Sequence, residues 1–574
     1  MVEGRKRVVI ENVEPEINGG AFPIKRVIGE KVIVEADIFA DGHDSLSAML
    51  LFKKHGNREW EECPMKFIEN DRWRGEFIVE EIGIYYYTFQ CWVDHFKTWQ
   101  KDLKKKFVAG QDISEDILIG VQHIEEASKR SSEPEKGKLK EVADLLRNEK
   151  DKDKVFTLAM SKKVNEAMDR CIDRKSGTFY EKELSVVVDR KKALFSSWYE
   201  IFLRSCTSQP NRHGKFKDCE AFLPEIQRMG FDVLYFPPIH PIGTTNRKGK
   251  KNSLQVEPND VGSPWAIGSE EGGHKAVHPE LGTIEDFTGF IDKAKEYGME
   301  IAMDLAFQCS PDHPYVKKHP EWFRWRPDGS VQYAENPPKK YEDILPLNFE
   351  TENWQELWNE LKSIVVFWIE KGVRIFRVDN PHTKPFAFWE WLITGIKRDC
   401  PDVIFLSEAF TRPKVMYRLA KIGFTQSYTY FTWRNTKWEF MQYINELAQT
   451  DVRQYFRPNF WPNTPDILPE HLQYGGRPAF MMRLVLAATL SSNYGIYGPA
   501  FELCIQEAIP GKEEYLDSEK YEIKKWDWDK EGNLRDFIAR VNAIRKENPA
   551  LQTTYNIQYY ESPELVARNP LELI

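Results

Sequence analysis

The sequence predicts a multidomain protein in which a (β/α)₈ TIM barrel follows an N-terminal immunoglobulin-like β-sandwich and a helical insert. Three observations support this fold class. Alternating apolar residues mark the first hundred positions, a helical apolar period follows, and from about residue 190 short apolar strands alternate with amphipathic helices. The length of 574 residues exceeds one compact core and fits three or four structural units.

Composition narrows the functional class. Hydrophobic residues make up 41% and charged residues 29% of the chain, which indicates a globular protein. A net charge of −9 predicts no nucleic-acid partner. The sequence contains no run of about 18 apolar residues, so we expect no membrane partner either. The eight cysteines are scattered without a CxxC pair, and no signal-like leader opens the chain, so we expect reduced thiols and a cytoplasmic protein.

Residues 1–110 read as the β-sandwich. The segments Val32–Phe39, Asp71–Glu80 and Ile84–Val93 alternate apolar and polar residues, and Gly, Asp and Asn turns separate them. An immunoglobulin-like arrangement is the natural expectation for such a run of strands.

Residues 111–190 read as a small helical insert, because the apolar period changes there. Leu139, Val142, Leu145 and Leu146 fall on one predicted helical face, and the charged run Arg147–Lys154 is predicted to join two helices in solvent.

Residues 191–548 read as the barrel with long loop insertions. No Gly-rich phosphate or dinucleotide fingerprint follows the first strand, so the alternative of a doubly wound open sheet is less favoured. The expected strands are Ser196–Phe202, Phe231–Ile239, Glu300–Phe307, Val373–Asp379, Val403–Phe410, a weak one near Gln426–Phe431, one near Asn459–Asn463, and Leu490–Gly498.

Three acidic residues fall at or near the C-terminal ends of these strands: Asp304, Asp379 and Glu408. That rim of a (β/α)₈ barrel carries the active site. Cleaving or transferring a glycosidic bond requires one carboxyl group at the anomeric carbon and a second that moves a proton. An acidic residue at a strand end is also a common ion-pair or cap residue, so the argument rests on their joint occurrence.

Arg377 and Asp379 lie two residues apart on one strand and therefore point the same way. A guanidinium beside Asp379 would keep that carboxylate ionised, as a nucleophile requires. Glu408 ends an apolar run, which would raise its pKa and suit an acid/base.

Four short segments resemble the four characteristic regions of the α-amylase clan, glycoside hydrolase family 13: Met303–Gln308, Phe376–Asn380, Leu406–Phe410 and Asn463–Asp466. The resemblance implies a retaining double displacement with Asp379 as nucleophile, Glu408 as general acid/base and Asp466 as transition-state stabiliser. Without the resemblance, Asp466 reads as the N-cap of a helix over Ile467–Gln473. The chain departs from typical amylases, because Gln308-Cys309 and Pro465 stand where the clan carries sugar-binding histidines.

Longer segments resemble the bacterial α-1,4-glucan:maltose-1-phosphate maltosyltransferases over nearly all of residues 5–550. They are Pro237–Ser253, Pro320–Glu350, Arg377–Pro385 and Glu513–Glu522. The resemblance implies maltose 1-phosphate as donor, an α-1,4-glucan as acceptor, a homodimer, and neither cofactor nor metal. It places six residues at the donor: Lys248, Gln308, Asp343, Asn380, Lys520 and Tyr521.

A phosphate leaving group carries about −1.5 to −2 charges, so cations and neutral donors are expected around it. Lys339 and Tyr341 join the candidates for this reason, although a lysine in so polar a loop is more commonly solvated surface. Asp343 fits a sugar-hydroxyl acceptor better than a metal ligand, since Glu342 is the one carboxylate beside it in the loop.

Relatives of this kind close with an antiparallel β domain, whereas 28 residues follow Lys546 here. Residues 549–574 therefore read as the start of a truncated C-terminal domain or as a divergent tail.

Three functions stay open from the residues. A maltosyltransferase is favoured over an α-glucan hydrolase or another transglycosylase, because the histidines are missing and the loops are rich in lysine. A non-catalytic glucan-binding protein is disfavoured, because Asp379, Glu408 and Asp466 are all present.

Overall fold

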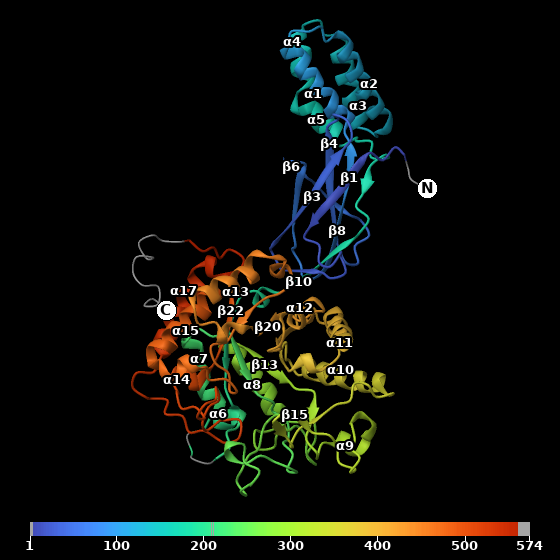
Figure 1. Cartoon of the computed structure of the whole chain (residues 1–574). Helices are drawn as coiled ribbons and strands as arrows, with labels where there is room; N and C mark the ends of the chain where they lie inside the picture. Colours follow the sequence, from blue (N-terminus) through green and yellow to red (C-terminus); the bar gives the residue numbers. More distant parts are fainter. Residues whose placement is uncertain (1–3, 208, 210–211, 561–574) are drawn as a thin grey trace. The chain divides into compact units, whose positions relative to one another are not determined.

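The computed structural model of the chain describes residues 4–207, 209 and 212–560 (Figure 1). It divides into two compact units, Met1–Val188 and Asp189–Ile574. Part of the predicted tail, residues 561–574, lies outside the described residues; the remainder contains a short 3₁₀ turn, Pro549–Gln552.

The first unit contains two packed β-sheets. One has the order β1-β3-β7-β6 and the other β2-β10-β8-β4-β5, with β9 paired to β8. The strands are β1 Val8–Glu14, β2 Ile24–Val27, β3 Lys31–Ala40, β4 Leu46–Lys54, β5 Glu61–Pro64, β6 Lys66–Glu69, β7 Arg72–Ile78, β8 Gly83–Val93, β9 Thr178–Phe179 and β10 Leu184–Asp189. Alternate residues of β3 are fully buried between the sheets, as the alternating pattern predicted.

Five helices form the insert: α1 His95–Val108, α2 Ser114–Arg130, α3 Glu135–Asn148, α4 Lys152–Ala159 and α5 Lys162–Asp169. The insert therefore begins before the expected boundary at residue 110. Its last expected stretch instead contains β9 and β10, which pair with β8.

One residue of the predicted apolar helical face is misplaced. Leu145 is 48% exposed, and the buried stripe of α3 consists of Leu139, Val142, Ala143 and Leu146. These four follow the i, i+3, i+4, i+7 spacing of one helical face, and Leu145 falls beside that face.

The second unit is the barrel. Its eight described parallel strands follow the order β20-β19-β18-β13-β12-β11-β22-β21. They are β11 Ser196–Glu200, β12 Val233–Phe236, β13 Glu300–Leu305, β18 Ile375–Asp379, β19 Ile404–Glu408, β20 Gln426–Ser427, β21 Asn459–Phe460 and β22 Asn493–Tyr497. A parallel bridge between Ser427 and Pro458 closes the sheet, and Asn459 donates to Gln426 at 3.0 Å across the same seam. Each predicted strand of the barrel is present.

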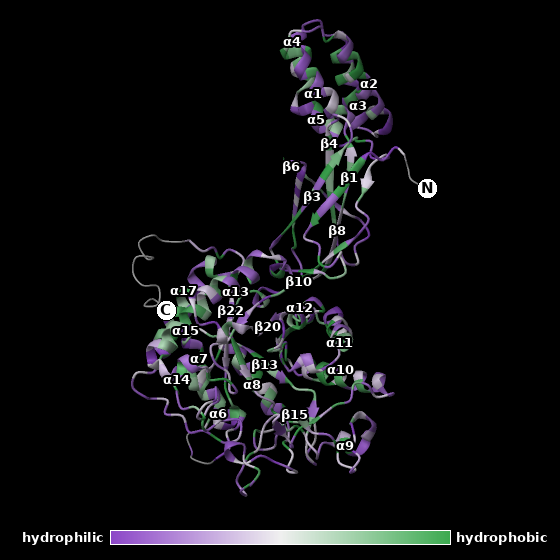
Figure 2. Ribbon diagram, in the orientation of Figure 1, coloured by the Kyte–Doolittle hydropathy of each residue, from purple (hydrophilic) through white to green (hydrophobic). Residues whose placement is uncertain are grey.

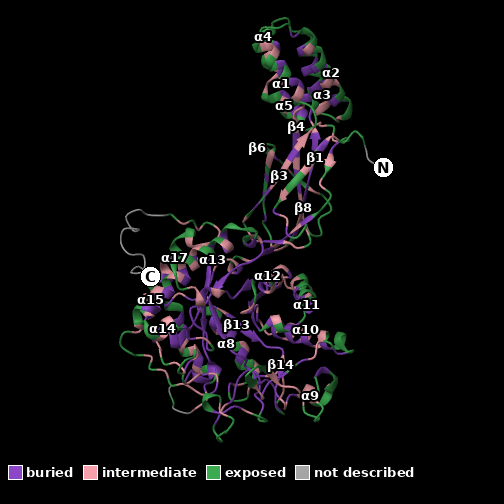
Figure 3. Ribbon diagram, viewed as in Figure 1, coloured by how far each residue is buried: buried purple, intermediate pink, exposed green. Residues whose placement is uncertain are grey.

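The helices that surround the strands are α7 Leu223–Arg228, α8 Ile284–Glu296, α10 Trp354–Glu370, α11 Phe386–Asp399, α12 Pro413–Lys421, α13 Lys437–Gln449, α15 Gly476–Leu490 and α17 Arg535–Glu547. Strands such as β13 are hydrophobic and buried within this ring (Figures 2 and 3). Parallel strands covered on both faces need such continuous apolar runs.

Short elements lie in the connections of the barrel: α6 Phe216–Cys219, β14 Gln308–Cys309, α9 Pro314–Lys318, β15 Ala334–Asn336, β16 Lys339–Tyr341, β17 Leu345–Pro346, α14 Glu470–Tyr474 and α16 Gly498–Glu502. The loop between β13 and α10 holds five of them. None of the described helices has the length and apolar content that crossing a bilayer requires.

Candidate active site

Three acidic side chains lie on adjacent strands of the barrel. Asp304 lies near the end of β13, and Asp379 and Glu408 end β18 and β19. Asp379 and Glu408 are direct partners in the strand register. The predicted placement of these three residues at the C-terminal rim is therefore present.

Arg377 connects the three carboxyl groups from below. Its Nη1 lies 2.9 Å from Asp304 Oδ2 and 2.9 Å from Asp379 Oδ1, and its Nη2 lies 3.1 Å from Glu408 Oε1. Burial lowers the pKa of Arg377, but the surrounding carboxylates raise it well above its usual value. The guanidinium is therefore a permanent cation that Asp379 and Glu408 share.

The surroundings of Glu408 raise its pKa. Burial and the neighbouring Asp379 raise its pKa to about 7, although Arg377 opposes that shift. The backbone N–H of Asn380 donates to Glu408 Oε2 at 3.1 Å. Asn380 holds this position with a left-handed backbone at φ 42°, a conformation that asparagine tolerates better than most residues.

Asp304 lies beneath the other two carboxyl groups. Burial raises its pKa to about 7, against the effect of Arg377, and Tyr235 donates its hydroxyl to Asp304 Oδ2 at 2.6 Å. Because its side chain is fully buried, Asp304 positions Arg377 and does not face the cleft.

Asp466 is not a helix cap. Helix α14 begins at Glu470 with Pro469 at its N-cap, so the alternative prediction of Asp466 as the N-cap of this helix is wrong. Lys520 Nζ instead lies 3.0 Å from Asp466 Oδ1. Surrounding protein raises the pKa of Asp466, but Lys520 outweighs this and the net shift is downward. The carboxylate therefore stays charged where it faces the cleft.

A cleft of about 690 Å³ opens above these groups. Eight of the twelve predicted site residues line it: Asp379, Glu408, Asp466, Gln308, Asn380, Lys520, Lys339 and Tyr341. Segments far apart in the chain thus converge on one hollow, which is large enough for a sugar-sized ligand.

The remaining four predicted residues do not line the cleft. Arg377 lies under the acids, and Lys248 pairs with Glu342 while almost completely buried. Burial raises the pKa of Asp343, against the opposing charges of Lys248 and Lys520. Burial also raises the pKa of Tyr521 to about 12, with Lys520 opposing. Asp343 and Tyr521 thus lie within electrostatic range of Lys520 in the cleft without lining it, and Lys248 lies within electrostatic range of Asp343.

Sequence reasoning missed several groups at the cleft. Lys384 lines it, and its Nζ lies 3.3 Å from the carbonyl oxygen of Asn380; burial lowers its pKa. Trp265 lies under Lys520, with Nζ 4.9 Å from the ring centroid, and Glu514 pairs with Lys339. The position of Lys384 five residues after Asp379 was an available signal, whereas Trp265 and Glu514 come from distant loops.

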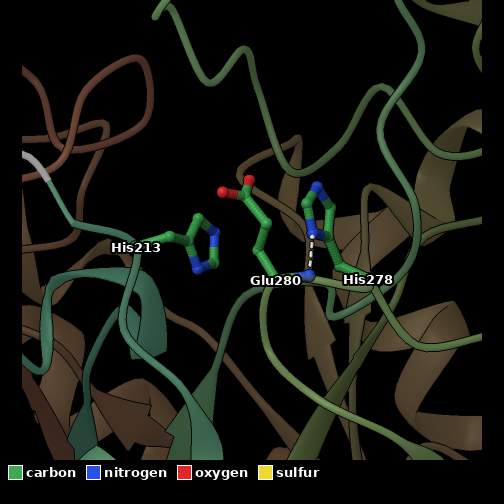
Figure 4. Close-up of side chains that lie close together, drawn as sticks. All are labelled: His213, His278 and Glu280. Atoms are coloured by element: carbon green, nitrogen blue, oxygen red, sulfur yellow. Dashed lines mark hydrogen bonds between the residues drawn. The ribbon is translucent and has the colours of Figure 1, made fainter.

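A separate cluster near the barrel holds three possible metal ligands: His213, His278 and Glu280 (Figure 4). The backbone N–H of Glu280 donates to His278 Nδ1 at 3.2 Å, so the proton of this neutral ring is on Nε2. His213 Nδ1 donates to the carbonyl oxygen of Gly214 at 2.8 Å. Only His213 Nε2 and the Glu280 carboxylate remain as ligand atoms, fewer than a structural zinc site uses.

Comparison with known proteins gives consistent matches. The N/S domain of α-1,4-glucan:maltose-1-phosphate maltosyltransferase matches residues 6–190. The protein of that name from Chlorobaculum tepidum is 58% identical over 557 residues, covering 97% of this chain and 83% of its own length. The one from Methylacidiphilum infernorum is 56% identical over 572 residues, with coverages of 99% and 85%.

Solved structures similar to the chain include an α-amylase from Lactobacillus plantarum. The two share 21% sequence identity with a TM-score of 0.49, over 64% of this chain and 83% of the amylase.

Proposed function

The chain belongs to the α-1,4-glucan:maltose-1-phosphate maltosyltransferase family, and from this we propose that it transfers maltosyl units from α-maltose 1-phosphate to the non-reducing end of α-1,4-glucans. Phosphate is the leaving group. The observation that carries the proposal is the shared Arg377 cation, which holds two carboxyl groups on adjacent strands at the floor of a lysine-containing cleft.

Asp379 is the proposed nucleophile. Neighbouring strands lie about 4.8 Å apart, and retaining glycosidases separate their two carboxyl groups by about 5 Å. The register pairing of Asp379 with Glu408 is consistent with that spacing. Asp379 Oδ forms a bond to the anomeric carbon as the bond from that carbon to the phosphate oxygen breaks.

Glu408 is the proposed acid/base. In the second step the glucan 4-hydroxyl attacks the anomeric carbon, Glu408 accepts its proton, and the bond to Asp379 breaks. A pKa near 7 suits a group that must change protonation at neutral pH. Phosphate leaves with little protonation, so the first step depends less on Glu408.

Asp466 is the proposed transition-state stabiliser. Its side chain is 54% exposed towards the cleft. A charged carboxylate there would favour the positive charge that develops on the sugar ring.

The phosphate is proposed to contact Lys520, Lys339, Asn380 and Tyr341, with Gln308 on the sugar. Lys520 and Lys339 line the cleft, and each ammonium group is held there by an ion pair with a carboxylate. A phosphate that enters the cleft can therefore contact both ammonium groups where they already lie. Lys248, Asp343 and Tyr521 are proposed to support this wall, and no step requires a metal or cofactor.

We further propose a cytoplasmic homodimer. All eight cysteines are free thiols, which fits a reducing compartment. Sedimentation of the full chain would measure the oligomeric state directly.

The function is tested by mixing the full chain with maltose 1-phosphate and maltotetraose. The proposal expects released phosphate and products that grow by two glucose units. Glucose or maltose release without chain growth would indicate a hydrolase, and the absence of any product would indicate a binding protein. Either result would overturn the proposal.

A further inference from the structure

Aromatic rings lead out of the cleft onto the surface formed by α10 and α11. Phe349 lines the cleft, and Trp354 and Trp391 are 41% and 37% exposed. We call Phe349, Trp358, Trp354 and Trp391, with the buried Phe388 beneath them, the aromatic stripe. Exposed tryptophans at such positions are not required by the barrel core, so they call for another explanation.

Ring contacts show that the stripe is continuous. Phe388 lies 5.0 Å from Phe349, 5.4 Å from Trp358 and 6.5 Å from Trp391, measured between ring centroids. Trp358 in turn lies 4.7 Å from Trp354 and 5.5 Å from Trp391. The rings therefore form one packed cluster from the wall of the cleft to the outer faces of the two helices, and the buried Phe388 connects its inner and outer members.

Polar groups accompany the outer end of the stripe. Lys362 lies four residues after Trp358 on the same face of α10, with Nζ 5.5 Å from the centroid of the Trp391 ring. Lys362 also lines an open groove of about 400 Å³ together with Asn359, Ser363 and Lys275. Apolar ring faces beside hydroxyl, amide and ammonium groups match the alternating faces and edges of a sugar chain.

We propose that the aromatic stripe binds the body of the α-1,4-glucan acceptor outside the cleft. The inference rests on the proposed function, since it names where that substrate continues. Two observations favour a glucan over a second copy of this chain. The stripe begins with Phe349 at the wall of the cleft, where the reacting end of the glucan must enter, and its outer end lies beside the ammonium group of Lys362.

The test compares a long and a short acceptor. In the Trp354→Ala/Trp391→Ala double variant, the KM for glycogen should rise about tenfold, equivalent to about 1.4 kcal/mol. The KM values for maltotetraose and maltose 1-phosphate should stay within about twofold, because neither needs the outer surface. The Trp354→Phe/Trp391→Phe variant retains rings and should recover most of the glycogen affinity.

Trp438→Ala is the matched control, because Trp438 is 68% exposed on α13 and does not line the cleft. It should leave every KM unchanged. An unchanged glycogen KM in the double alanine variant overturns the inference. Dissociation of a dimer in that variant, with the glycogen KM unchanged, overturns it in favour of a second copy.

Failure of the proposed function can be distinguished from failure of glucan binding by the aromatic stripe. If the wild-type chain releases no phosphate from maltose 1-phosphate, that function falls, while electrophoresis through a gel containing glycogen still measures glucan binding. The stripe predicts that glycogen retards the wild-type chain more than the double alanine variant. Equal retardation contradicts it.

Discussion

At the scale of single residues, Arg377 joins the candidate reacting groups. Its guanidinium binds Asp379 and Glu408 at once, and it also pairs with Asp304, which accepts a hydrogen bond from the Tyr235 hydroxyl. Arg377 opposes the rise in the pKa of Glu408, but burial and the neighbouring Asp379 outweigh it and keep that pKa near 7.

The first prediction separates the two half-reactions. In Glu408→Ala, mixing with maltose 1-phosphate should still release about one phosphate per active site, because phosphate needs little proton assistance. Steady-state transfer should fall at least about 10³-fold, because no base activates the glucan hydroxyl. Rapid-quench measurement of phosphate checks both steps. Loss of the phosphate burst, with transfer no more affected than the first step, would refute the assignment.

The second prediction concerns pH. Burial raises the pKa of Glu408 to about 7, so the carboxyl group keeps its proton up to neutral pH. A base works only when deprotonated, and the transfer rate should therefore fall as pH drops below about 7. Because Asp304 titrates in the same range, the apparent pKa belongs to the coupled group.

The kcat for transfer, measured between about pH 5.5 and 8.5, checks this prediction. Glu408→Gln should lack the limb near pH 7. An inflection near the ordinary glutamate pKa in the wild-type chain would contradict it.

At the scale of elements, the positions of the proposed reacting residues were predictable because these residues end strands. Asp379 and Glu408 end short, buried and mainly apolar strands, and the parallel alternation of strands and helices places those ends at one rim. The cleft walls were less predictable. Trp265 and Glu514 belong to loops whose paths depend on tertiary packing and leave no periodic signal.

Helix packing in the insert gives the third prediction. A Cβ added to Gly120 of α2 would lie 2.0 Å from the indole of Trp99 on α1. Gly120→Ala should therefore destabilise the unit Met1–Val188 by about 1–3 kcal/mol through overpacking. Phosphate release at 25 °C should persist, because the site lies in the other unit.

Gly137→Ala is the control, since its Cβ would meet the flexible side chain of Glu133 at 3.1 Å. Thermal unfolding of both variants measures the difference. Equal stability of the two variants would show that α1 and α2 do not pack as described.

At the scale of the whole molecule, a buried ion cluster ties the start of the barrel to its later segments. Asp189 pairs with Lys397 of α11 and with Arg457, which precedes β21. Burial raises the pKa of Asp189, but these cations outweigh that effect and hold it at about 2. The cluster joins segments that are more than 200 residues apart.

The fourth prediction follows from this cluster. Asp189→Asn removes the charge that both cations face and should lower the free energy of unfolding by about 3 kcal/mol. Asp402→Asn, which breaks the partly exposed pair with Arg374, should cost less than about 1 kcal/mol. Urea denaturation at neutral pH compares them, and equal losses would contradict the prediction.

The pH dependence has a defined sign. The folded pKa of Asp189 lies below its ordinary value, so its contribution is present above about pH 4 and is lost as pH falls towards 2. The stability advantage of the wild-type chain over Asp189→Asn should shrink over that window.

The order of sandwich, insert and barrel was predictable from the changes in apolar period. The boundaries were not, because β9 and β10 return to the sandwich after the insert and their pairing with β8 is non-local. Within helix α3, Leu145 was also misplaced, because the spacing of apolar residues alone did not determine which leucines face the core.

The central claim is that Asp379 forms a covalent bond to the transferred maltosyl group. The most direct measurement is the intact mass of Glu408→Ala after mixing with maltose 1-phosphate, followed by peptide mapping. The account predicts a gain of one maltosyl group on the peptide that contains Asp379, and no gain in Asp379→Asn/Glu408→Ala. Phosphate release without any mass gain, or a maltosyl group on another residue, would contradict it.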